Sequence, residues 1–167
     1  MGLTLLDLLV AVAVILIIAA IASPWLVGAR TAANEASAIA ALRAISAAED
    51  LYARACGQGA YAASLPRLGL PPPGSSAPFL AQTLTASPSP VNDGYTISVE
   101  PGADASPGPN DCHGMATVSS FYATAQPVTL GTTGTRSFAT TGAHRIWQLV
   151  GGQAPTEPFL APATPIQ

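Results

Sequence analysis

Lysine is absent from this chain of 167 residues, and charged residues of every kind make up only 9% of it, where about 25% is usual for soluble domains. The formal net charge is −3, and the six arginines are spread along the sequence without forming a run. A protein that binds nucleic acid through its phosphates needs clustered cations, which this sequence does not offer. We therefore expect no nucleic-acid partner.

Signatures of catalysis and of bound cofactors are also missing. The only cysteines, Cys56 and Cys112, do not form a C-x-x-C pair, which argues against a zinc knuckle, a redox motif or a c-type haem site. There is no G-x-S-x-G elbow, P-loop or dinucleotide fingerprint. Cys112 and His113 are adjacent, and neighbours in sequence rarely converge as a nucleophile and its base. We expect a protein that is not an enzyme and has no cofactor.

Three aspartates in loops are the only calcium candidates. Asp93, Asp104 and Asp111 offer the hard oxygen ligands that Ca²⁺ prefers. Their spacing fits no EF-hand, and Asp beside Gly, Asn and Pro is typical of turns. We therefore predict no metal site and retain these three carboxylates as calcium candidates.

The sequence does contain one long apolar run, at its N-terminus. Leu8 to Ala29 includes no charged residue, and as a helix this stretch would be roughly 33 Å long, enough to cross a hydrocarbon core of about 30 Å. No basic residue precedes it, unlike in a secretory signal peptide. We expect residues 3–29 to form a transmembrane or assembly helix.

The one acid at the head of this run, Asp7, has two explanations. It lies three residues after Thr4, as in a capping box, where a carboxylate is favoured by the helix dipole. Alternatively, an acid in an apolar segment is retained because a partner charge meets it. Since Arg30 is more than six helical turns away, that partner would be an N-terminal amine, most simply on another subunit.

The segment resembles the N-terminus of type IV pilins and of the pseudopilins of type II secretion. In that family a Gly precedes the cleaved bond, the fifth mature residue is an acid and the twenty-second is a Pro. Counted from Leu3, Asp7 is fifth and Pro24 is twenty-second. The resemblance implies cleavage after Gly2, methylation of the Leu3 amine, and pairing of Asp7 with that amine on a neighbouring subunit during assembly.

The resemblance also implies a location, partners and a covalent link. The subunit would wait in the inner membrane and then join an extracellular filament of identical copies, after contact with a prepilin peptidase and an inner-membrane assembly platform. Export would place Cys56 and Cys112 in an oxidising compartment, where we expect one disulfide between them.

The rest of the sequence predicts an α+β fold. Ala38, Leu42, Ile45, Ala48 and Tyr52 form an apolar stripe of helical period that continues the N-terminal helix, and we place Glu35, Arg43 and Asp50 opposite it. Gly57 and Gly59 should end the helix. About four antiparallel strands are expected after Gly94, at 95–100, 116–125, 136–140 and 144–148, with a tight hairpin at Thr141 and Gly142.

Six segments follow from this prediction. They are a leader remnant at 1–2, the apolar helix at 3–29, its amphipathic continuation at 30–56, a connecting loop at 57–93, the sheet at 94–150 and a Pro-rich, extended or mobile tail at 151–167. The expected function is that of a structural subunit of a type IV pilus-like filament. The alternatives are a type II secretion pseudopilin, or a signal-anchored extracytoplasmic binding domain that never polymerises, in which Asp7 is only a capping residue.

Overall fold

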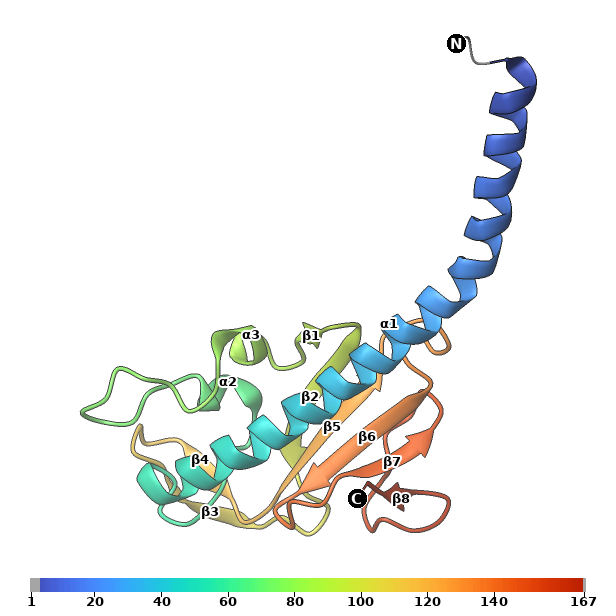
Figure 1. The fold of residues 1–167 in the computed structure, drawn as a ribbon. Coiled ribbons are helices and arrows are strands. Elements are labelled where there is room, and N and C mark those ends of the chain that lie inside the picture. Colours follow the sequence, from blue (N-terminus) through green and yellow to red (C-terminus); the bar gives the residue numbers. More distant parts are fainter. Residues whose placement is uncertain (1–3, 167) are drawn as a thin grey trace.

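A computed structural model describes residues 4–166, without the side chains of residues 19–25. Its main element is α1 (Leu5–Ala55), a helix of 51 residues that begins after Thr4 and includes Arg54 in its last turn. Figure 1 shows the second half of α1 lying across one face of a β-sheet and the first half rising away from the rest of the molecule. The helix ends at Ala55 and is capped by Cys56, directly before the predicted glycines.

The sheet has six antiparallel strands in the order β1-β2-β5-β6-β7-β8, and a separate pair is formed by β3 and β4. The strand bounds are β1 Val91–Asn92, β2 Tyr95–Pro101, β3 Pro107–Asn110, β4 Ala116–Val118, β5 Phe121–Pro127, β6 Arg136–Thr141, β7 Trp147–Val150 and β8 Thr164–Pro165. Two short helices, α2 (Leu65–Leu68) and α3 (Gln82–Thr85), lie between α1 and the sheet in the sequence. The α+β class and the helix-on-sheet packing are thus as predicted.

The count of about four strands was too low, because the additional strands carry little sequence signal. β1 and β8 are two residues long, too short for a visible alternation, and β3 has the sequence Pro-Gly-Pro-Asn. The strand expected at 116–125 is divided: β4 pairs with β3, and β5 pairs with β2 and β6.

The last hairpin and the tail also differ from the expectation. β6 and β7 do pair as a hairpin, but five residues separate them, and His144, expected in a strand, lies in this loop with a φ of 58°. The tail is attached to the sheet: β8 pairs with β7, and the Phe159 ring stacks on Trp147 with centroids 5.2 Å apart.

The core lies between α1 and the inner face of the sheet. Every member of the predicted apolar stripe is buried, and it meets alternate residues of β2, β5 and β6. Largest among these sheet residues are Tyr95, Ile97, Phe121 and Phe138. Burying one large apolar side chain is worth about 1.5–3 kcal/mol, so this contact fixes the second half of α1 on the sheet.

The apolar half of α1 was expected to cross a membrane. Of the helices that the structure describes, none combines the length and the apolar character that crossing a membrane requires. The proposed span of 3–29 includes Leu3 and the side chains of residues 19–25, which lie outside that description.

Candidate assembly surface

Residues 5–18 of α1 expose apolar side chains on all sides. Exposure ranges from 83% at Leu5 to 47% at Val12, and both Ile15 and Leu16 are 64% exposed. Soluble monomers rarely expose contiguous apolar patches larger than a few hundred Å², so such a surface normally meets a partner. The exposed apolar residues from 5 to 18, which we call the assembly surface, are Leu5, Leu6, Leu8, Leu9, Val10, Val12, Val14, Ile15, Leu16, Ile17 and Ile18.

A reciprocal capping box stands at the head of this surface. The Asp7 backbone N–H donates to Thr4 Oγ1 at 3.3 Å, and Asp7 Oδ2 accepts from the Thr4 backbone N–H at 3.1 Å and from Thr4 Oγ1 at 2.7 Å. The capping interpretation of Asp7 is therefore confirmed. Both contacts of the Asp7 carboxylate use Oδ2.

The other predicted assembly residues, Gly2, Leu3 and Pro24, lie wholly or partly outside the described structure. Gly2 and Leu3, the expected cleavage and methylation positions, lie outside the described residues, and so does the amine that Asp7 would meet. The α1 backbone is helical at Pro24, whose side chain is also outside the description.

The helix joins the globular part at Thr31, the first partly buried residue after the exposed stretch 26–30. Thr31 Oγ1 donates to the Thr132 carbonyl at 3.2 Å, and Asn34 Nδ2 donates to the Thr133 carbonyl at 3.0 Å. Backbone carbonyls of the β5–β6 turn thus hold the helix at the point where it reaches the globular part.

One turn further along, the buried carboxylate of Glu35 forms an ion pair with the partly exposed Arg136 of the sheet. Its Oε2 accepts from Arg136 Nε at 2.9 Å and from Nη2 at 2.5 Å, while its Oε1 accepts from the N–H and hydroxyl of Thr135. Burial opposes ionisation, but these bonds outweigh it and hold the pKa of Glu35 below its usual range. We had placed Glu35 opposite the stripe, which was wrong, because it lies three residues before Ala38 and shares its face.

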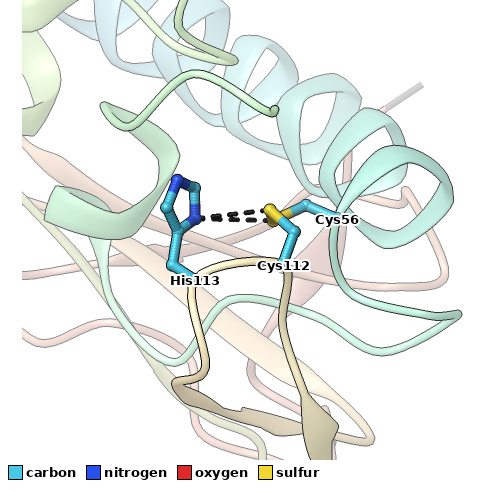
Figure 2. A group of neighbouring side chains, drawn as sticks. All are labelled: Cys56, Cys112 and His113. Carbon is cyan, nitrogen blue, oxygen red and sulfur yellow. Dashed lines mark hydrogen bonds between the residues drawn. A yellow bond between two sulfur atoms is a disulfide. The ribbon is translucent and has the colours of Figure 1, made fainter. Parts of the chain in front are cut away.

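The other end of α1 is tied to the turn after β3 by the predicted disulfide. Cys56 and Cys112 are bonded, and Cys112 N–H donates to the Cys56 carbonyl at 3.0 Å. Figure 2 shows the His113 ring facing both sulfurs, with Nδ1 at 3.7 Å from Cys56 Sγ and 3.3 Å from Cys112 Sγ. A cysteine nucleophile needs a free thiolate, and here both sulfurs are in the disulfide.

The same turn contains Asp111, one of the three calcium candidates. Asp111 Oδ2 accepts from the Tyr52 hydroxyl at 2.6 Å, and its Oδ1 accepts from the backbone N–H groups of His113 and Met115, both at 2.8 Å. Burial opposes ionisation of Asp111, but these bonds and the Arg67 charge hold its pKa below the usual range. Both oxygens of the Asp111 carboxylate therefore already have hydrogen-bond partners within the chain.

The three calcium candidates do not come together. Asp93 accepts from Ser37 Oγ at 2.5 Å, about four helical turns along α1 from the Tyr52–Asp111 contact, and Asp104 lies on an exposed turn. Among the described residues, the only group with metal-ligand spacing is Cys56, Cys112 and His113, whose sulfurs are bonded to each other.

Sequence reasoning missed Glu49, a fully buried acid. Its Oε2 accepts from the Ala62 backbone N–H at 2.8 Å, which ties α1 to the segment that follows it. The signal was present in the spacing, since Glu49 follows Ile45 by four residues and precedes Tyr52 by three, and so falls on the buried stripe.

No family model matches this chain, and no similar curated protein or solved structure was found for it. The resemblance to pilins therefore depends on the N-terminal residues alone.

Proposed function

We propose that this protein is the structural subunit of a type IV pilus-like filament, assembled through the first half of α1. The observation that carries the proposal is the assembly surface, an apolar helix half that projects from a domain whose own core is already covered. Lipid would cover these side chains in the membrane, and once a subunit leaves it, a bundle of like helices would offer burial of the same kind. Association of many copies is thus the simplest way to cover this surface.

The ties between α1 and the globular part suit a filament subunit. The Glu35–Arg136 pair and the carbonyl contacts of Thr31 and Asn34 lie where the helix leaves the sheet. A load on the first half of α1 would therefore reach the sheet through several polar contacts and the core behind them. The disulfide at Cys56 holds the opposite end of the helix.

Within such a bundle, Asp7 would set the position of each incoming subunit. An unpaired carboxylate in an apolar bundle is costly, and an N-terminal amine of a neighbouring subunit would neutralise it. Only one axial offset between neighbours would bring the two charges together. The proposal includes processing after Gly2, methylation of Leu3, residence in the inner membrane before assembly and a final position in a surface filament.

One observation favours the alternative of an anchored binding domain that never polymerises. The capping box already gives Asp7 a role within a single chain, so its position needs no partner subunit. The pseudopilin alternative shares the assembly mechanism and differs only in where the filament acts.

A pair of variants separates assembly from capping. Asp7→Asn keeps a side-chain oxygen that can accept from Thr4 but removes the charge, whereas Thr4→Ala removes the hydroxyl of the cap and keeps the charge. We expect Asp7→Asn to abolish filaments, and Thr4→Ala, which weakens the cap by about 1 kcal/mol, to retain them. Filaments are counted by electron microscopy of sheared surface material, normalised to total protein in the cells.

Two outcomes would contradict this account. Normal filaments from Asp7→Asn would show that the charge is not needed for assembly. Equal losses in both variants would show that the cap, and not pairing between subunits, is what matters at Asp7.

A further inference from the structure

The face of the sheet opposite α1 holds an open polar pocket. Alternate residues of β2 and β5 face the core, so the residues between them face outward, where Ser98 is paired with Thr124 and Glu100 with Tyr122. The segment that follows β7 borders this surface, and together they enclose about 460 Å³, within the roughly 300–1,000 Å³ of typical ligand pockets. The residues that matter here are Ser98, Glu100, Tyr122, Thr124, Gln126 and Gln153.

Most of these side chains are neutral groups that can donate and accept hydrogen bonds. Gln126 and Gln153 are exposed primary amides, each able to donate and accept at once. The hydroxyls of Ser98 and Thr124 lie 2.8 Å apart and retain further hydrogen-bonding capacity. The pocket therefore presents both donors and acceptors from uncharged groups.

An aromatic ring forms part of the wall and is held in position. The Tyr122 hydroxyl donates to the Pro155 carbonyl at 2.5 Å, and its ring centroid lies 6.3 Å from that of Phe159, which in turn stacks on Trp147. Because hydrogen bonding and ring packing both fix it, a ligand would not have to order this side chain.

The charged side chains at the pocket are acidic. Glu100 lines it, and Glu157 lies close by, where its Oε2 accepts from the Ala103 backbone N–H at 2.8 Å. Burial, and then these two acids, raise the pKa of Tyr122 to about 12. No cation lines the pocket among the described residues, so an anionic ligand would be repelled.

We propose that this pocket binds a neutral saccharide. A sugar ring offers alternating hydroxyls, which suit amide, hydroxyl and carboxylate groups, and apolar C–H faces, which suit a fixed aromatic ring. The negative surroundings select neutral sugars over sialylated or sulfated ones. The site faces away from α1 and is complete in one chain, so it does not depend on filament formation.

The test is a titration of the isotope-labelled full chain, followed by NMR. The protein is kept in phosphocholine micelles, since glucoside and maltoside detergents carry sugars. The probes are the methyl glycosides of glucose, galactose, mannose and N-acetylglucosamine, with N-acetylneuraminic acid as the anionic comparison. We expect at least one neutral probe to shift the resonances of Ser98, Thr124, Gln126 and Gln153, and the anionic probe to leave them unchanged.

Variants connect the binding to the pocket. Replacing Gln126 and Gln153 together by Ala should weaken binding at least about tenfold, the loss expected for two hydrogen-bonding side chains. Gln82→Ala, an exposed glutamine in α3, is the matched control and should leave the affinity unchanged. The proposal is overturned if no neutral probe shifts these resonances, if the double variant binds as tightly as the wild type, or if the anionic probe binds equally well.

Discussion

Glu49 is the residue that depends most strongly on its surroundings. It is fully buried in α1, its Oε2 is bonded to the Ala62 N–H, and its Oε1 has no partner within the described part of the chain. Burial, and to a smaller extent the charge of Asp50, raises the pKa of Glu49 to about 8. The side chain is therefore protonated in the folded protein at neutral pH, while in the unfolded chain it is ionised.

This difference predicts a fall in stability as the pH rises. The contribution of Glu49 is fully present below its unfolded pKa of 4.5 and is lost as the pH approaches 8, by roughly 3–5 kcal/mol in total. Glu49→Gln is neutral at every pH, so it should match the wild type near pH 5 and exceed it by a few kcal/mol near pH 8. Denaturant unfolding of both full-length proteins, followed by tryptophan fluorescence, measures the difference.

Comparing the two proteins at each pH cancels the titration of every other group. A difference between wild type and Glu49→Gln that stays constant from pH 5 to pH 8 would contradict the assignment of a protonated, buried Glu49.

Single acids are also where sequence reasoning was least reliable. Glu35 and Glu49 both fall on the buried face of α1 by their spacing, yet Glu35 was placed on the opposite face and Glu49 was overlooked. Glu35 is tolerated because Arg136, which is 101 residues away, meets it, and Glu49 because it takes up a proton. Neither cause is visible in the local sequence.

At the scale of elements, α1 was the most predictable part of the molecule. Its apolar stripe, the glycines that follow its end and the capping box at Thr4 are all local patterns, and the structure follows them. The strands with clear alternation, β2 above all, were found for the same reason. β1, β3 and β8 were not, because pairing with neighbours rather than their own sequence makes them strands.

The disulfide at the end of α1 should stabilise the fold without being needed to form it. Cys56 and Cys112 are 56 residues apart in the sequence, and closing a loop of that length is worth about 4 kcal/mol in the chain-entropy model. The turn would still be held by the Tyr52–Asp111 bond and by the Cys112 N–H to Cys56 carbonyl bond. We expect the Cys56→Ala, Cys112→Ala double variant to lose about 2–5 kcal/mol of unfolding free energy and to keep its native circular dichroism spectrum.

Reduction of the wild type serves as the matching control, since it should lower the stability by a similar amount. An unfolded double variant would contradict this prediction, and so would one as stable as the oxidised wild type.

The whole molecule divides into two parts with different requirements. The second half of α1 and the sheet bury a continuous core, so the globular part covers its large apolar side chains within one chain. Residues 5–18 of α1 project from this part and expose their apolar side chains, which only contacts outside the chain could cover. Sequence pattern predicted this division, because the apolar run and the amphipathic stripe are both local patterns.

The most direct test of the filament proposal is the intact mass and N-terminal peptide map of the protein in sheared surface material and in membranes. Our account predicts that the sheared fraction contains a chain beginning at Leu3 with an added methyl group on its amine. A protein found only in membranes, with Met1 or an upstream leader retained, would contradict the filament and favour an anchored binding domain.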